Sequence, residues 1–281
     1  MIKHRFTTED WVLAIAKYTL LSVLLIGVLF PVFWLIISSF KLEREIIAFP
    51  PTLFGTVYTT ANYSRIFNTL PMFTYLRNTV IFAAGSTAFA LLFDSLAGYA
   101  FSRFSFKGKN VLFIMVLLTM MIPFQVIMIP LFLLSHALGT LNTFAGLIMP
   151  RMTTAFGIFM MRSYFSQLPK DLEEAARIDG LNEFGIFFRI MLPLVKPGLM
   201  TLGIFHLMSN WNDLLYPMMM TNDPNMRVLT AGLAMFVGQR ATLFYGVQLA
   251  GAVISITPLL ILYIFFQKYF VANLANTGLK D

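Results

Sequence analysis

Six apolar runs dominate the pattern along the chain, and polar or charged segments separate them. Each run reaches the length of about 20 residues that a helix needs to cross a bilayer. The pattern therefore predicts an all-α membrane protein with six transmembrane helices. We expect these helices near Tyr18–Phe40, Thr79–Phe101, Val111–Leu134, Thr143–Phe165, Gly198–Met220 and Tyr245–Phe270.

Proline recurs inside the predicted helices, at Pro31, Pro123, Pro130, Pro150, Pro217 and Pro258. Each proline removes a backbone N–H donor and tends to kink its helix. Inside a bilayer such breaks are tolerated where neighbouring groups or a wet cavity satisfy the freed carbonyls. The prolines favour a transporter over a simple anchor, although membrane enzymes contain them too.

Composition agrees with a membrane protein. The 281-residue chain is 58% hydrophobic and 12% charged, against about 25% charged residues in a soluble domain. The net charge of +7 does not point to nucleic acid, because Lys and Arg lie between the apolar runs, where topology explains them. The absence of cysteine excludes disulfides and thiolate metal sites.

The distribution of Lys and Arg predicts the orientation. With the N-terminus in the cytoplasm, roughly twice as many of them lie on the cytoplasmic side as outside, the usual bias of membrane proteins. We expect residues 1–17 to form a cytoplasmic N-terminus and residues 18–281 a transmembrane domain with its core at about 72–270, with both termini cytoplasmic. The first run is interpreted as a retained span, because no small-residue cleavage site follows a short apolar core.

Two long loops are expected outside, Lys41–Arg77 and Thr221–Phe244. The first contains Phe49-Pro50-Pro51, and the second contains the turn signal Asp223-Pro224-Asn225. The pattern leaves open whether they are solvated connectors or a landing surface for an extracytoplasmic partner.

A charged segment, residues 169–193, lies within the predicted cytoplasmic loop 166–197. Asp171 and Glu174 have the spacing of a capping box, so a helix is expected to begin there. Glu173 and Arg177 are spaced to pair across one helical turn. Gly180 is expected to end the helix in the left-handed conformation.

A second short helix is expected directly after this glycine. Asn182 is its predicted cap, and Pro193 and Pro197 are expected to end it. An apolar stripe follows helical spacing through Phe184, Phe187, Phe188 and Met191. The pattern predicts two short helices, one with the small residues Ala175 and Ala176 and one with an aromatic face, and an ordinary packed connection would show the same pattern.

Among the polar residues inside predicted spans, the informative ones are Asp94, Arg151, His206, Asn210 and Asp213. An ionised side chain at mid-span costs about 2.5–3.5 kcal/mol on the insertion scale, so these residues are expected to face the bundle interior. His206, Asn210 and Asp213 fall in one narrow stripe of the fifth helix. The stripe is either a structural hydrogen-bonded cluster or one wall of a translocation path, for which Arg151, His206, Asn210 and Asp213 are the candidates.

Depth in the membrane predicts one specific pair among these residues. Arg151 lies about 8 residues, or roughly 12 Å, below the outer edge of the fourth span. Asp213 lies about 7 residues, or roughly 10 Å, below the same edge in the fifth span. We therefore expect the two opposite charges to pair or to face one polar cavity with Asn210, while Asp94 lies in the inner half.

No catalytic motif is evident in the sequence. Gly108-Lys109-Asn110 lacks the upstream glycine and the following Ser or Thr of a nucleotide-binding loop, so the chain is not expected to be an ATPase. The histidines His4 and His136 are expected to be solvated or interfacial, and no metal-ligand spacing occurs. If transport is driven by ATP, a separate subunit must hydrolyse it.

The charged segment also resembles a known motif. It resembles the EAA loop of ABC importer permeases at every motif position. The matching pattern is Glu174-Ala175-Ala176, three residues, Gly180, nine residues, Ile190, one residue and Leu192-Pro193. The segment Asn210-Trp211-Asn212-Asp213 followed by Tyr216-Pro217 resembles the fifth-span signature of carbohydrate-type permeases, and the C-terminal residues 270–280 resemble the tail of MalG-like subunits. Arg151 has no counterpart in that pattern.

The resemblance implies a MetI-like type-1 importer permease fold with cytoplasmic EAA coupling helices. The residues it assigns to contact with the ATPase are Glu174, Ala175, Ala176, Gly180, Ile190, Leu192 and Pro193. It implies a second, homologous permease, two ATPase subunits that hold ATP and Mg, and an extracytoplasmic substrate-binding protein, in a bacterial inner membrane. This chain itself is expected to bind no cofactor and no nucleic acid.

The expected cargo is a sugar, an oligosaccharide or a polyol. One alternative is an ABC permease for a non-sugar solute, and another is an ion-coupled secondary transporter with Asp94 and Asp213 as coupling sites. An integral-membrane enzyme or redox subunit would need catalytic or cofactor ligands, and none is evident in the sequence.

Overall fold

The computed structural model describes residues 8–240 and 244–278, and the described part is helical with no β-strand. This confirms the all-α prediction. The chain divides into two compact units, Met1–Leu70 with Phe236–Thr257 and Pro71–Met235 with Pro258–Asp281. Three described helices are long and apolar enough to cross a membrane, and the number rises to six if each of three bent helix pairs is one span.

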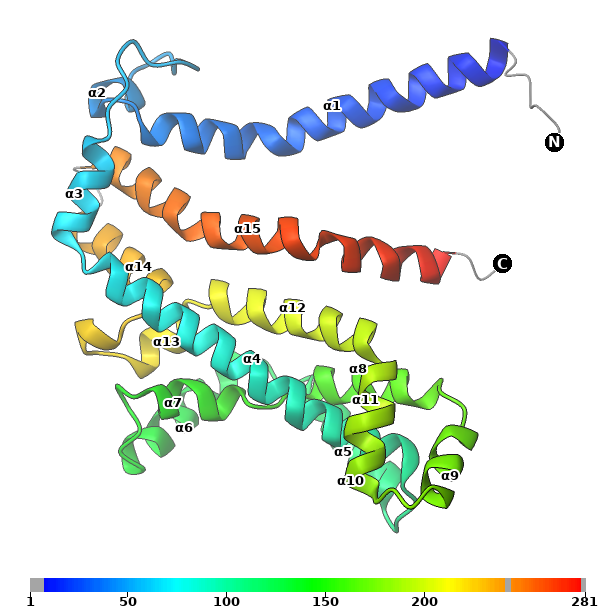
Figure 1. Cartoon of the computed structure of the whole chain (residues 1–281). Helices are drawn as coiled ribbons and strands as arrows, with labels where there is room; N and C mark the ends of the chain where they lie inside the picture. Colours follow the sequence, from blue (N-terminus) through cyan, green and yellow to red (C-terminus); the bar gives the residue numbers. More distant parts are fainter. Residues whose placement is uncertain (1–7, 241–243, 279–281) are drawn as a thin grey trace. The chain divides into compact units, whose positions relative to one another are not determined.

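The first unit contains the N-terminal helix and the outer segment that follows it. Its helices are α1 (Thr8–Ser39), α2 (Glu43–Ile46) and α3 (Ala61–Thr69), with the end of α14 (Leu229–Arg240) and the start of α15 (Tyr245–Gly278) (Figure 1). Helix α1 begins ten residues before the predicted span, because the apolar sequence continues back to Trp11. Residues 1–7 of the predicted cytoplasmic N-terminus lie outside the described residues.

The outer segment of this unit is folded rather than a loose connector. The carboxylate of Glu43 accepts hydrogen bonds from the backbone N–H groups of Tyr245 and Gly246, at 2.6 and 2.9 Å. These groups begin α15, where the helix dipole favours a negative charge. The Asn62 amide donates to the carbonyl of Ser39 at 2.9 Å and so fixes α3 against the end of α1.

Helix α4 (Met72–Arg103) is the centre of the second unit, and α8 (Ala155–Ser166) and α12 (Lys196–Asn212) pack along it (Figure 1). The approach of α8 is so close that a Cβ atom at Gly98 would lie 2.7 Å from the backbone nitrogen of Arg162. Both α4 and α15 extend beyond the predicted second and sixth spans. The other elements of this unit are α5 (Lys109–Thr119), α6 (Phe124–Ala137), α7 (Phe144–Ile148), η1 (Met149–Arg151), α9 (Asp171–Ile178), α10 (Glu183–Ile186), η2 (Phe187–Met191), α11 (Leu192–Leu194), α13 (Leu215–Met220) and η3 (Pro224–Met226).

Three predicted spans are broken, which corrects the expectation of continuous helices. The third bends by 97° between α5 and α6, where Pro123 cannot continue a hydrogen-bonded turn. The fourth bends by 47° after η1, which contains Pro150. In the fifth, α12 ends at Asn212, Asp213 has an extended backbone, and α13 begins at Leu215. The third bent pair lies before this span, where Glu183–Leu194 meets α12 at 80°.

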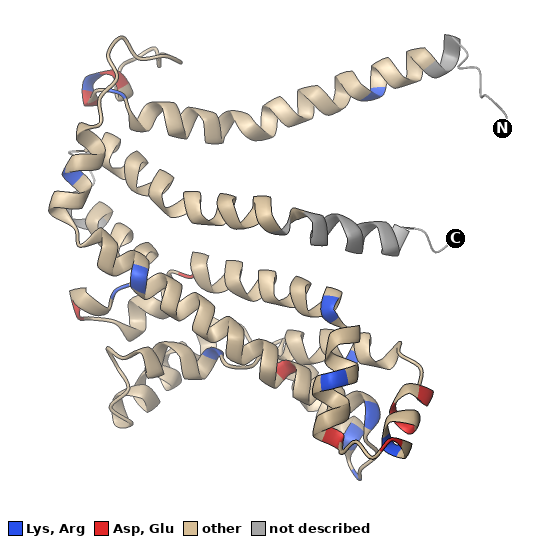
Figure 2. Ribbon diagram, viewed as in Figure 1, with Lys and Arg blue, Asp and Glu red and all other residues tan. Residues whose placement is uncertain are grey.

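Charged residues are unevenly distributed in the second unit. Figure 2 shows them gathered around α9, α10 and the adjacent helix ends, whereas the long helices are almost uncharged along their middles. Such a distribution suits helices that cross hydrocarbon and a loop region that lies in water.

Candidate functional sites

The charged segment folds as two helices joined at a glycine, as predicted. The second helix continues through Pro193 to Leu194, so the expected end at Pro193 is wrong. Helix α9 ends before Gly180, whose φ of +84° lies in the left-handed region that favours glycine. The side chain of Asn182 then accepts a hydrogen bond from the N–H of Gly185 at 2.8 Å and caps α10. These two features confirm the predicted turn and the predicted second cap.

The ion pairs of this loop differ from the prediction. Lys170 is the N-cap of α9, and its side chain makes no capping hydrogen bond. The prediction of a capping box between Asp171 and Glu174 is therefore wrong. Glu173 does not pair with Arg177, because it is buried and lies 3.6 Å from the Nε atom of Arg103 at the end of α4. A buried carboxylate needs a nearby cation more than an exposed one does, so the contact with α4 replaces the local pair.

Arg177 pairs instead with Glu183 across the turn. Its Nε atom donates to the carboxylate at 2.8 Å, with each side chain about half exposed. This hydrogen bond raises the pKa of the Arg177 guanidinium, which is charged at all physiological pH values in any case. The exposed pair therefore links α9 to α10 without burying charge.

The aromatic stripe is split between the protein interior and its surface. Phe187 and Met191 are buried, whereas Phe184 and Phe188 are exposed. The buried side of this helix, which includes the π-helical turn η2, contains Phe187 and Met191 but neither Phe184 nor Phe188. The prediction of one common face is therefore wrong, and Phe184 and Phe188 remain on the surface.

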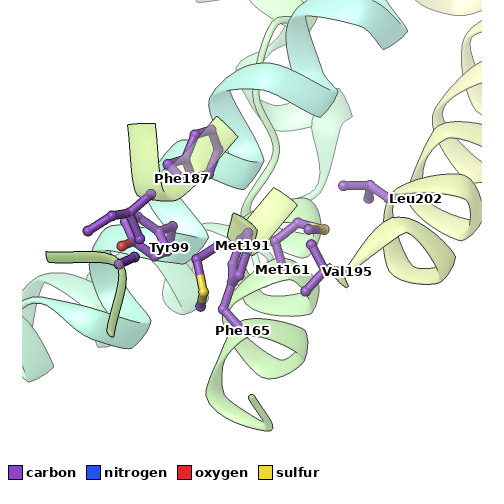
Figure 3. Packing of buried hydrophobic residues seen from close by; sticks show 9 residues of the cluster. Tyr99, Met161, Phe165, Phe187, Met191, Val195 and Leu202 are labelled. Carbon is purple, nitrogen blue, oxygen red and sulfur yellow. The ribbon is translucent and has the colours of Figure 1, made fainter. Parts of the chain in front are cut away.

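The buried half of the loop packs on the spans. Phe187 lies 5.3 Å from the ring of Tyr99 on α4 and 6.1 Å from that of Phe165 on α8, measured between ring centroids. Figure 3 shows these rings with Met191 and with Leu202 of α12 in one cluster. The cluster thus joins the loop to three helices of the second unit, so a displacement of the loop is transmitted to them by packed side chains.

The motif residues divide in the same way. Ala176 is buried, and Ile190 and Leu192 pack against the cluster. Exposed motif positions are Glu174, Ala175, Gly180 and Pro193. Only the exposed positions are available to a partner, so the predicted small-residue patch consists of Ala175 without Ala176.

A second group of polar residues surrounds Asp94 on α4. Its carboxylate accepts hydrogen bonds from the Thr153 hydroxyl at 2.6 Å and from the Thr154 N–H at 2.9 Å. The Nε2 atom of His206 on α12 lies 3.2 Å from the same carboxylate. These contacts satisfy Asp94 within the protein.

The Asp94 carboxylate also lies at the N-terminus of α8. Thr154 caps this helix by accepting a hydrogen bond from the Gly157 N–H at 3.0 Å. A Cβ atom at Gly157 would lie 1.8 Å from a carboxylate oxygen of Asp94, so only glycine leaves the required space. Sequence patterns did not single out Thr153, Thr154 or Gly157, although a threonine directly before the first residue of a helix is a cap signal.

Arg151 and Asp213 form the predicted ion pair through Nη2 and Oδ2. The guanidinium also lies over the rings of Tyr216 and Phe124, at 4.6 and 5.1 Å from their centroids. Phe124, Arg151 and Asp213 lie in the third, fourth and fifth predicted spans, all of which are broken. Arg151 therefore contacts the other two spans close to their breaks. In the described part of the chain, Asp94 does not join this pair, as expected, and instead accepts hydrogen bonds from Thr153 and Thr154 between η1 and α8.

The stripe predicted on the fifth helix is interrupted, because Asp213 lies beyond the end of α12. His206 and Asn210 remain on the helix and line a cavity of about 260 Å³. Its other lining residues are Arg151, Thr154, Phe156, Phe205 and Ser209. No group of three or more possible metal ligands occurs among the described residues.

Residues 90–276 match the model of one protein family, described as the binding-protein-dependent transport system inner membrane component. This match covers most of the chain and includes the loop, the Asp94 group and the broken spans. The chain belongs to this family. It is therefore a multi-pass membrane component of a transport system, and we call it the permease below.

Similar proteins agree with this assignment over nearly the full length. The permease is 39% identical over 254 residues to the "Arabinooligosaccharides transport system permease protein AraQ" of Halalkalibacterium halodurans, covering 89% of this chain and 91% of the relative. It is 35% identical over 256 residues to the "Trehalose/maltose transport system permease protein MalG" of Thermococcus litoralis, covering 90% and 91%. These matches do not favour the secondary transporter that the sequence left open.

A solved structure shows the same fold. It is a bacterial ABC transporter involved in the import of the acidic polysaccharide alginate, and one of its chains superimposes with a TM-score of 0.81 at 27% identity. The superposition covers 95% of the permease and 99% of that chain. The predicted importer permease fold is thereby confirmed.

Proposed function

We propose that the permease forms half of the translocation path of an ATP-driven importer for a sugar, an oligosaccharide or a polyol. Its partners are a second, homologous permease, two ATPase subunits that hold ATP and Mg, and an extracytoplasmic substrate-binding protein. Relatives named for arabinooligosaccharides and for trehalose and maltose support a carbohydrate cargo. Both termini and the coupling loop, residues 166–197, lie in the cytoplasm of a bacterial cell.

One observation carries this proposal. The loop presents Glu174 and Ala175 at its surface, while its other side is packed into the cluster of Tyr99, Phe165 and Phe187. A surface of this kind can receive a partner on one side and transmit the partner's motion to the spans on the other. Closure of an ATPase dimer on ATP binding would thus shift the equilibrium between inward-facing and outward-facing states.

The absence of cysteine from the chain allows a direct test of topology and partnership. A single Glu174→Cys variant should react with a membrane-impermeant maleimide in inside-out vesicles and not in intact spheroplasts. The matched control is Phe54→Cys in the outer segment, which is exposed and should show the opposite behaviour. In the assembled transporter, a bifunctional maleimide should cross-link Glu174→Cys to the ATPase.

Uptake into vesicles tests the energy source. Accumulation of sugar should require internal ATP and the binding protein, and it should survive collapse of the proton and sodium gradients. Uptake driven by either gradient without ATP would refute the proposal and support an ion-coupled transporter.

A further inference from the structure

The cavity between α8 and α12 contains a buried polar atom without a protein partner. Asn210 is 3% exposed, and its Nδ2 atom makes no hydrogen bond to any described residue. Leaving a buried donor unsatisfied costs about 1–3 kcal/mol. Because Asn210 lines the cavity, a molecule within it can accept this hydrogen bond.

The walls of the cavity combine an aromatic and a polar side. Phe156 and Phe205 lie edge to face, with ring centroids 6.1 Å apart, and both rings are partly exposed. Asn210, Ser209 and Arg151 supply polar groups. A sugar ring presents an apolar C–H face and an edge of hydroxyl groups, and this pair of surfaces matches the two sides of the cavity.

The volume limits what the cavity holds. At about 260 Å³ it is smaller than the roughly 300–1,000 Å³ of sites for drug-sized ligands. One monosaccharide unit is therefore the suitable occupant, and the rest of an oligosaccharide would extend beyond it.

The charges around the cavity are already compensated. Arg151 is paired with Asp213, and His206, the other ionisable residue among the described lining residues, contacts Asp94. A carboxylate on the ligand would have to compete with Asp213 for the guanidinium, whereas a hydroxyl group can use the N–H donors that this pair leaves over. The site is thus complementary to an uncharged sugar unit.

We propose that this cavity is a subsite for one uncharged sugar unit, in which Asn210 donates to a ring substituent and Asp213 disfavours acidic sugars. This inference rests on the proposed carbohydrate cargo. It adds that this subunit itself contacts the substrate and that it distinguishes neutral sugars from uronates.

Protection of a single cysteine tests binding without relying on the specificity of the binding protein. Ser209→Cys places a thiol in the cavity of a chain that has no other cysteine. In the purified, assembled transporter, neutral arabinotriose should slow its alkylation by the factor 1 + [L]/Kd, about tenfold at nine times Kd. A mannuronate trisaccharide at equal concentration should leave the rate unchanged. Met208→Cys, exposed on the same helix and outside the cavity lining, is the control that neither sugar should protect.

Two further substitutions in the Ser209→Cys background assign the roles. Asn210→Leu should raise the Kd for arabinotriose by about tenfold or more. Asn210→Ala serves the same purpose if the leucine variant fails to assemble. Asp213→Asn should allow the mannuronate trisaccharide to protect the thiol, because its carboxylate can then pair with Arg151.

Two results would overturn the subsite. One is the absence of protection by arabinotriose, as expected if water alone fills the cavity, and the other is protection that persists after both changes at Asn210. Equal protection by the neutral and the acidic probe would overturn the selectivity. ATP-driven sugar uptake measured on the same preparation separates these failures from failure of the proposed function.

Discussion

The buried ion pair between Arg103 and Glu173 offers a quantitative test of how the coupling loop is attached to the spans. Their side chains are 4% and 6% exposed, and Arg103 also donates to the carbonyls of Phe165 and Leu168, each at 2.6 Å. Arg103→Gln strands the Glu173 carboxylate and removes both carbonyl contacts, so we expect a loss of about 3–5 kcal/mol in the free energy of unfolding. Glu173→Gln leaves Arg103 with its two carbonyls, and a smaller loss of about 1–3 kcal/mol is expected.

The exposed pair of Arg177 and Glu183 in the same loop is the matched control. Its side chains are each 45% exposed, so water and salt screen the pair, and Arg177→Gln should leave the unfolding curve close to that of the unchanged protein. The measurement is reversible unfolding in mixed detergent and SDS micelles, followed by circular dichroism. The double variant Arg103→Gln with Glu173→Gln should be less destabilised than the sum of the single variants.

The same variants separate attachment from transport. If the buried pair holds α9 on α4, Arg103→Gln should weaken the stimulation of ATP hydrolysis by the liganded binding protein, and Arg177→Gln should not. The reasoning would be refuted if Arg103→Gln were no more damaging than Arg177→Gln, or if the effects in the double variant were strictly additive.

Two glycines give further predictions. The added methyl group of Gly180→Ala meets no atom within 4 Å, so its conformational strain of roughly 1 kcal/mol or more comes from the backbone φ of +84° alone. The variant should reduce sugar uptake and stimulated ATP hydrolysis, while membrane insertion stays normal. Gly108→Ala, with a φ of +81° and equally open surroundings, carries the same strain outside the loop; an equal loss of coupling in this variant would count against a special role of Gly180. Gly157→Ala should displace the Asp94 carboxylate and lower the free energy of unfolding in the same assay. Adding Asp94→Ala should partly restore that free energy. A wild-type unfolding curve for the single variant would disprove the close contact.

The positions of the membrane helices follow from the sequence, because long apolar runs have few alternatives in a bilayer. The breaks follow only in part. Pro123 and Pro150 signal two of them, since proline cannot continue a hydrogen-bonded turn. The extended backbone at Asp213 carries no local signal, and its conformation coincides with the tertiary contact to Arg151.

Predictions about side-chain pairs succeeded where one geometric constraint was strong. The equal depth of Arg151 and Asp213 in neighbouring spans was enough to predict their pair. Local spacing was misleading for Glu173 and Arg177, because the buried Arg103, distant in sequence, takes the place of the local partner. The hydrogen bonds from Thr153 and Thr154 to Asp94 were also out of reach, since the cap signal of Thr154 does not indicate which carboxylate faces it.

The contact between Asp94 and Gly157 has a consequence for how this family can diverge. The carboxylate occupies the space that any larger residue at position 157 would need, so the two positions cannot change independently. A lineage that gains a side chain at 157 must first shorten or lose the acid at 94, and a lineage that keeps the acid is confined to glycine. Positions 94 and 157 should therefore covary among related sequences. That covariation would reveal a packing constraint that neither position shows alone.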